Sequence, residues 1–226
     1  MRAIVLGAVV QIAAPARAAD SVCHGTPSAG SLERGMRLPS SGPNFRAYSS
    51  AGVALGRTHA HSRVVAAIVD AYAELDRDAP GTTYVYGETG FATGGSFKPH
   101  RTHRNGLSVD FMVPVLDRRG RSVPLPGHAK NRYGYDLEFD ANGRLGDLRI
   151  DFEALAAHLL ALDRAGRRRG APIGRVILAP EYLPALFATS RGRELRGRLR
   201  FERGRVWWRH DEHYHVDFVV PCKPMR

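Results

Sequence analysis

The sequence predicts an α+β domain in which a small, mostly antiparallel sheet is flanked by helices. Apolar residues recur at helical spacing in residues 63–76 and again after Asp151, so both segments are expected to be helices. Residues 107–113 and 213–220 instead alternate and are rich in β-forming residues, as strands are. The connections between these elements vary in kind, which argues against a regular β–α alternation with a parallel sheet.

The first third of the chain is expected to contribute a single helix. Residues 20–62 are rich in Gly, Ser and Pro, and we expect them to wrap irregularly around the domain. The helix of residues 63–76 follows. A short strand at 82–86 and a flexible, Gly-rich loop at 87–95 then lead to the first candidate site.

The rest of the chain is expected to form a hairpin, a long helix and two short elements. A turn at residues 140–143 separates the two arms of the hairpin, 135–139 and 144–150. Asp151 is placed to cap the long helix, and His158 is expected on its exposed surface. A strand and a short helix are predicted at 175–178 and 180–188.

The two ends of the chain indicate export. Residues 1–19 combine a basic start, a short apolar run and a small-x-small site, as in a cleavable signal peptide, although an ordinary strand is the alternative. Residues 20–226 are expected to form one domain. Cys23 and Cys222 are the only cysteines, and in an oxidising compartment we expect them to pair; two unpaired thiols are the alternative.

The charge of the chain is strongly positive, +11 by formal count. A basic exported protein is attracted to nucleic acid, anionic lipid or an acidic wall polymer. However, the arginines are dispersed and no nucleic-acid-reading motif accompanies them, so no nucleic-acid partner is expected. No run beyond the signal peptide is long and apolar enough to predict a membrane helix, and the oligomeric state is not predicted.

One candidate site begins before the predicted strand 107–113 and continues into it. His100 and His103 stand three residues apart, a turn at Asn105-Gly106 follows, and Asp110 lies within the strand. A carboxylate in the middle of an apolar strand is costly unless something pairs with it. A divalent metal that also binds His103 is one such partner.

A second candidate site lies near the C-terminus, in the predicted strand 213–220. His213 and His215 project from the same face of that strand, because strand side chains alternate, and Tyr214 points to the other face. His210 stands three residues before His213. The two candidate sites together hold five histidines and one embedded carboxylate.

This combination can form a catalytic zinc site, which takes three protein ligands and leaves one position for water. His103, Asp110 and one histidine of the His213/His215 pair supply three ligands that suit Zn²⁺ better than Ca²⁺ or Mg²⁺. The spacing alone does not decide which of the pair binds the metal; the other can be a general base. The predicted chemistry is metal-assisted hydrolysis of an amide. The remaining histidines are expected to be structural: His24, His59, His61, His128 and His158.

The pattern of His103-x₆-Asp110 with a distant His213-x-His215 resembles that of the lysostaphin, D-Ala-D-Ala and hedgehog-type metallopeptidase clan. Within the clan, the chain is most similar to the penicillin-insensitive murein endopeptidases. The additional His100 and His210 and the Gly106-Leu107-x-Val109-Asp110 core carry this closer resemblance. It spans roughly residues 80–222.

The resemblance implies a hedgehog-like fold and an exported, periplasmic zinc endopeptidase. Such an enzyme cuts the peptide cross-links of peptidoglycan, typically D-alanyl to meso-diaminopimelyl bonds. The implied zinc ligands are His103, Asp110 and His215. His213 is implied as the general base, and His100 and His210 as residues that hold the water or the reacting group beside the metal.

The sequence departs from the family pattern around the predicted site. The family often has an acidic residue where Ser108 stands and Gln where Arg104 stands, and its better-known members carry several disulfides. Arg101 and Arg104 border the site, where they can bind substrate carboxylates or remain solvated. Two alternatives follow: a related zinc D,D-carboxypeptidase or dipeptidase, or a non-catalytic exported metal-binding protein.

Overall fold

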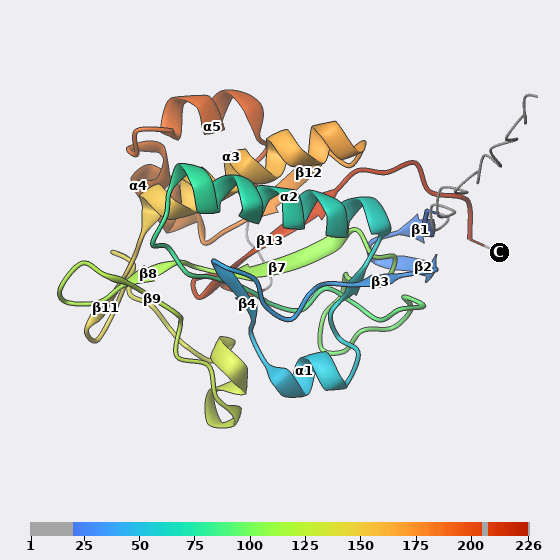
Figure 1. Cartoon of the computed structure of the whole chain (residues 1–226), viewed down its shortest axis with the longest axis horizontal. Coiled ribbons are helices and arrows are strands. Elements are labelled where there is room, and N and C mark those ends of the chain that lie inside the picture. Colours follow the sequence, from blue (N-terminus) through green and yellow to red (C-terminus); the bar gives the residue numbers. More distant parts are fainter. Residues whose placement is uncertain (1–19, 205–207, 226) are drawn as a thin grey trace, which may run out of the picture.

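Figure 1 shows the computed structural model, in which residues 20–204 and 208–225 are described. A five-stranded sheet crosses its centre in the order β12-β13-β7-β6-β4. In that order the strands are Ile173–Ile177, His213–Phe218, Ser108–Met112, Tyr84–Tyr86 and Phe45–Ala47. Only the β4–β6 pairing is parallel, so the α+β class and the mostly antiparallel sheet are confirmed. The predicted signal peptide, residues 1–19, lies outside the described residues.

Two long helices, α2 (Ser62–Asp78) and α3 (Phe152–Arg169), pack side by side on one face of this sheet (Figure 1). The Asp151 side chain accepts the Ala154 N–H at 3.0 Å, so the predicted cap of α3 is confirmed. The helix ends at Gly170, whose φ of 67° is a left-handed conformation that glycine adopts without steric cost.

The other elements are short. Strands β1 (Val22–Thr26) and β2 (Ala29–Glu33) form a hairpin, and β3 (Met36–Arg37) pairs with β5 (His59–Ala60). A second sheet has the order β10-β11-β8-β9, with strands Arg144–Leu145, Leu148–Ile150, Val115–Leu116 and Ser122–Val123. The short helices are α1 (Ser50–Ala54), η1 (Ala129–Gly134), η2 (Pro180–Tyr182), α4 (Leu183–Phe187) and α5 (Gly192–Arg198). Within the described ranges, no helix has the length and apolarity to cross a bilayer.

Two of the predicted elements are wrong. Residues 20–62 are not an irregular wrap, because they contain the β1–β2 hairpin and supply β4 to the central sheet. The predicted hairpin also turns elsewhere: β10 and β11 pair directly around residues 146–147, and residues 135–139 form no strand. The physical reason is local hydrogen bonding. Asp140 closes its own turn by accepting the Arg144 N–H, and the Phe139 N–H is donated to Asp211.

The core between the sheet and the long helices contains a buried histidine. His158 of α3 is fully buried, with its Nδ1 against the Tyr214 hydroxyl and its ring stacked 5.1 Å from Tyr72 and 5.0 Å from Tyr84. The expectation of an exposed His158 is therefore wrong. Neighbours surround α3 on several sides, since α2, α4, α5 and β12 all contact it. The Tyr214 side chain lies in this core, on the face of β13 opposite His213 and His215, as the alternation of side chains along the strand predicts.

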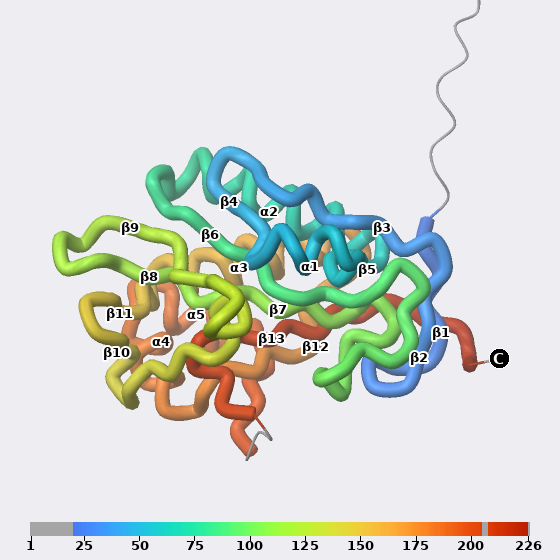
Figure 2. Tube along the Cα trace, turned by 90° about the horizontal axis from the view of Figure 1, so that it is seen from below, coloured from blue at the N-terminus to red at the C-terminus, as the bar shows by residue number. Residues whose placement is uncertain are grey.

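The opposite face of β7 and β13 is bordered by α1, by the segment that precedes β7 and by the segment between β9 and β10 (Figure 2). The end of the chain lies beside β1, and Cys23 and Cys222 form a disulfide between them. Lys223 also bonds to this strand, since its carbonyl accepts the Gly25 N–H at 2.8 Å. The predicted pairing of the two cysteines is thus confirmed.

We predict that His158 makes folding stability depend on pH. Burial lowers the pKa of His158 from 6.5 to about 3, so below pH 6.5 the unfolded chain binds a proton that the folded chain excludes. The contribution of His158 to the free energy of unfolding is complete above pH 6.5. Below that pH it falls by about 1.4 kcal/mol for each pH unit, which amounts to about 2.7 kcal/mol at pH 4.5. Urea unfolding at both pH values measures this, with His158→Gln as the non-titrating control. Equal pH dependence in both proteins would contradict the prediction.

We also predict that the disulfide contributes substantially to stability. It joins residues 199 positions apart. On the chain-entropy account, closing a loop of this length stabilises the fold by about 5 kcal/mol. The double variant Cys23→Ala/Cys222→Ala should unfold at correspondingly lower urea, and a reductant should shift the wild type towards the variant. Identical unfolding midpoints for the two proteins would exclude this contribution.

Candidate metal centre and active-site pocket

The pairing of β7 with β13 brings the two predicted sites together. In the register of these strands, His215 is the direct partner of Asp110, although the two are 105 residues apart in the chain. Strand alternation places His213 on the same face as His215, away from α2 and α3. The loop before β7 then adds His103, whose ring centroid lies 4.9 Å from that of His215.

Asp110 is the centre of this cluster and is fully buried. Its Oδ1 lies 2.8 Å from His215 Nδ1 and 3.2 Å from His103 Nε2, and its Oδ2 accepts the Tyr135 hydroxyl at 3.1 Å. Burial raises the pKa of Asp110, but the imidazoles of His103 and His213 outweigh burial and hold this pKa well below its usual range. The carboxylate is therefore ionised and available as a ligand.

His103 has an unusual environment for a core histidine. Its ring is fully buried, and neither Nδ1 nor Nε2 makes a well-formed hydrogen bond to the described residues, although Nε2 lies 3.2 Å from Asp110 Oδ1. A buried polar group without a partner is costly, and burial lowers the pKa of His103, so the neutral ring has a free lone pair. One nitrogen each of His100 and His103 and one oxygen of Asp110 lie within 4.8 Å of one another, so this group can hold a metal ion.

His215 is fixed from the side opposite Asp110. Its Nε2 lies 2.9 Å from Asp217 Oδ1, which leaves Nδ1 directed at the Asp110 carboxylate. Burial lowers the pKa of His215, but Asp217 and Asp110 outweigh it and raise this pKa to about 10. Asp217 is held in turn by Ser108 Oγ at 2.6 Å and Arg175 Nη2 at 2.6 Å. Such outer carboxylates commonly orient metal-binding imidazoles.

Left-handed backbone conformations help to aim two of the histidines. His103 has a φ of 65° and His210 a φ of 55°, a region that non-glycine residues rarely adopt. Strained backbone of this kind occurs preferentially at functional sites.

Close packing is also needed beside β7, where Gly87 allows Tyr135 to approach. A Cβ at position 87 would lie 2.5 Å from the Tyr135 hydroxyl.

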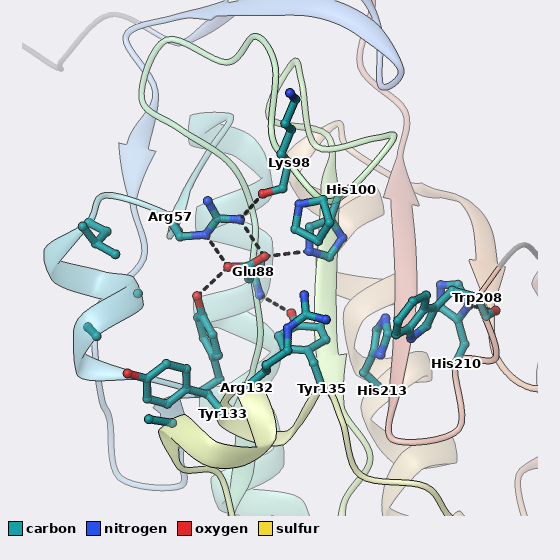
Figure 3. Close-up of a pocket in the computed structure, with 16 residues that line it drawn as sticks. Arg57, Glu88, Lys98, His100, Arg132, Tyr133, Tyr135, Trp208, His210 and His213 are labelled. Atoms are coloured by element: carbon teal, nitrogen blue, oxygen red, sulfur yellow. Dashed lines mark hydrogen bonds and ion pairs between the residues drawn. The ribbon is translucent and has the colours of Figure 1, made fainter.

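A pocket of about 460 Å³ opens over the cluster. Figure 3 shows Arg57 and Glu88 on one side of it and His210 and His213 on the other. His103, Asp110 and His215 are buried and do not line the pocket. The lining is otherwise largely aromatic and apolar: Tyr48, Ala51, Gly52, Leu55, Tyr133, Tyr135 and Trp208. The structure thus separates the histidines into a buried set and a set that faces the pocket.

Each histidine that faces the pocket is held by a different group. His100 Nε2 lies 2.6 Å from Glu88 Oε2, and His213 Nδ1 lies 2.8 Å from Glu212 Oε1. His210 Nδ1 instead donates to the backbone carbonyl of Trp208 at 2.7 Å. Burial lowers the pKa of His210 to about 3, whereas Glu212 and Asp110 raise the pKa of His213 despite its burial. A positive charge is therefore accommodated on His213 but not on His210.

Glu88 and its partners form one wall of the pocket. The Glu88 carboxylate accepts hydrogen bonds from Arg57 and, at 2.7 Å, from the Tyr48 hydroxyl. Burial raises the pKa of Glu88, but Arg57 and His100 outweigh burial and lower this pKa to about 2. The backbone N–H of Glu88 donates to the Tyr135 hydroxyl at 2.8 Å, so the same tyrosine connects this wall to Asp110.

The family model described as penicillin-insensitive murein endopeptidase matches residues 23–225 of the chain. The protein belongs to this family. No curated protein sequence matches the chain. Membership of a murein endopeptidase family makes the protein a peptidase that acts on the peptidoglycan of the cell wall. It also agrees with the resemblance that the histidine and aspartate spacing indicates.

Among the described residues, the lysine and arginines that line the pocket of this murein endopeptidase family member are Arg57, Lys98 and Arg132. The two arginines predicted to bind substrate, Arg101 and Arg104, do not line it. Their contact with substrate stays a prediction.

Several residues of the site were missed in the sequence. Asp217 shares the strand face of His213 and His215, so alternation along β13 could have identified it. Glu212 directly precedes His213. Glu88 lies in the Gly-rich segment after β6, and only the fold shows that this segment reaches His100. Tyr135 lies in a segment that was predicted to be a strand.

Proposed function

We propose that the protein is a zinc-dependent murein endopeptidase that hydrolyses peptide cross-links of peptidoglycan, of the D-Ala–meso-diaminopimelate type. The observation that carries the metal is the buried His103, whose two ring nitrogens make no well-formed hydrogen bond beside the ionised Asp110. An imidazole and a carboxylate in contact are a donor set that zinc accepts. The family supplies the substrate class.

The proposed zinc ligands are His103, Asp110 and His215. The Asp217 contact favours His215, because it occupies Nε2 and leaves Nδ1 facing the same Asp110 oxygen as His103. His100 is the competing third ligand, because His100, and not His215, groups with His103 and Asp110 by the mutual distances of the ligand atoms. We place it beside the metal because its ring reaches the pocket and is held there by Glu88. A zinc ion bound here supplies Lewis acidity, which acidifies a water and polarises the scissile carbonyl.

The histidines that face the pocket have complementary roles in this proposal. His213 directs Nε2 towards the centre, 3.9 Å from Asp110 Oδ2, where it accepts a proton from the attacking water and returns it to the leaving amine. His210 donates Nδ1–H to a carbonyl, so its Nε2 accepts a hydrogen bond from water or a substrate N–H. His100, held by Glu88 through Nε2, lies beside the proposed metal position, where it contacts the water or the reacting group.

We also propose that the protein acts in the periplasm after removal of residues 1–19 as a signal peptide, and that residues 20–226 form the single mature domain. The disulfide between Cys23 and Cys222 supports this location, because disulfides persist in oxidising compartments. A substrate in the cell wall supports it as well.

Digestion of purified, cross-linked peptidoglycan tests the activity. The zinc-loaded protein should convert dimeric muropeptides to monomers, and a chelator should abolish the conversion until zinc is restored. Mass analysis of the fragments reports the bond that is cut. Release of terminal D-alanine with intact dimers would instead indicate the carboxypeptidase alternative. Unchanged muropeptides at full zinc loading would leave only the non-catalytic metal-binding alternative.

Alanine variants test the ligand set. We expect His103→Ala, Asp110→Ala and His215→Ala to lose zinc, because each removes one of three protein ligands. His213→Ala should retain zinc and lose turnover by a factor of about 10²–10⁴, the usual contribution of a general base. Zinc is measured by elemental analysis of the purified protein.

Two comparisons make the ligand panel decisive. His100→Ala should retain zinc. If this variant loses zinc and His215→Ala does not, His100 and not His215 is the third ligand. Equal zinc loss in His213→Ala and Asp110→Ala would contradict the assignment of the base. The matched control is His128→Ala, which changes an exposed histidine that does not line the pocket.

A further inference from the structure

One buried carboxylate contacts the proposed base from behind. Glu212 is 1 % exposed, and its Oε1 lies 2.8 Å from His213 Nδ1. The contact with the imidazole of His213 stabilises the charged form of this carboxyl group. The carboxylate is therefore ionised, and an ionised carboxylate only accepts hydrogen bonds.

This contact determines which ring nitrogen of His213 carries the proton. Because Glu212 can only accept, His213 Nδ1 must be protonated to bond to it. In the neutral ring, Nε2 then has a free lone pair. That nitrogen is the one directed at the centre, 3.9 Å from Asp110 Oδ2. The ring is thus prepared to accept a proton at the position where the reaction releases one.

We propose that Glu212 is the positioning residue of the general base: it fixes the Nδ1–H tautomer of His213 and stabilises the ring once Nε2 is protonated. The inference rests on the proposed function. One proton moves from the attacking water to His213 Nε2 and then to the leaving amine nitrogen, while Glu212 stays ionised throughout. A carboxylate behind a histidine acts in this way in other hydrolases.

The surroundings distinguish Glu212 from a carboxylate that serves only the fold. Its neighbour Asp211 serves the fold: its Oδ2 accepts the Phe139 N–H at 2.7 Å and lies 3.2 Å from Arg209, and burial and the adjacent Glu212 raise the pKa of Asp211 to about 6. The backbone carbonyl of Glu212 accepts the Val113 N–H at 3.0 Å, which anchors the residue to the end of β7. His210, by contrast, donates Nδ1–H to the neutral carbonyl of Trp208 and not to a carboxylate, and burial and His213 outweigh the groups that favour a positive ring.

Kinetics of the zinc-loaded protein on cross-linked muropeptides test the proposal. Glu212→Gln should lower kcat by about 10–100-fold, the usual effect of removing an outer carboxylate, with KM and zinc content unchanged. Glu212→Asp keeps the charge and should lose less. The matched control is Glu74→Gln, which neutralises a mostly buried carboxylate of α2 that binds Arg164 and does not line the pocket, and it should leave kcat within about threefold of wild type. A kcat of Glu212→Gln equal to that of wild type would overturn the proposal.

A measurement that needs no turnover separates this inference from the proposed function. Nitrogen-15 spectra of the zinc-loaded protein with labelled histidine report the tautomer of His213, assigned by comparison with His213→Ala. Wild type and Glu212→Asp should show protonated Nδ1 and bare Nε2, and Glu212→Gln should show a mixture. A neutral ring with protonated Nε2 and bare Nδ1 in the wild type would overturn the inference even if the enzyme is active. If the wild type shows the expected tautomer but leaves muropeptides intact, the proposal that Glu212 fixes the tautomer of His213 stands and the proposed hydrolase activity is rejected.

Discussion

The burial of the Asp110 carboxylate in the middle of a sheet is the constraint on which the rest of the site depends. An unpaired charge in such a position costs several kcal/mol, so the surrounding elements must pair it. Strand β13 supplies His215 as its direct partner, the loop before β7 supplies His103, and Tyr135 reaches it from the segment after η1. The other face of the same strands packs against α2 and α3. The cluster around Asp110 is therefore supported by packed secondary structure.

Outside this centre, carboxylates hold the histidines in place. Glu88 holds His100, Glu212 holds His213 and Asp217 holds His215, each within hydrogen-bond distance of a ring nitrogen. Two of these carboxylates are held in turn by guanidinium groups, Glu88 by Arg57 and Asp217 by Arg175. The imidazoles therefore have little freedom to rotate. Fixed orientation is what a metal ligand or a proton acceptor needs, because small displacements are costly for both.

The cluster around Asp110 could be predicted from the sequence to a greater extent than the residues that line the pocket. A carboxylate in an apolar strand and two histidines with period two are local patterns, and strand pairing was the only long-range step that they required. The walls depend on irregular segments, whose paths follow no such period. Glu88, Tyr48 and Tyr135 meet only because three separate loops converge.

The errors in the sequence analysis have the same physical origin. The turn at residues 140–143 does exist, but Asp140 and Asp211 bind the backbone that a hairpin would have paired. The polarity of His158 favours the surface, but the neighbours of α3 enclose this residue. Tertiary packing decided both cases, as it commonly does when local preference is weak.

The charges of the cluster argue for a divalent ion more directly than the histidine spacing does. Four carboxylates contact the histidines: Glu88, Asp110, Glu212 and Asp217. Two guanidinium groups neutralise the outermost of them, one on each side. When the imidazoles are neutral, as metal ligands are, two negative charges remain in a largely buried volume, and the same excess of negative charge raises the pKa of His213 and of His215. A doubly charged cation between His103 and Asp110 would balance them, and it would give a ligand role to His103 Nε2, which lies 3.2 Å from Asp110 Oδ1 without a well-formed hydrogen bond.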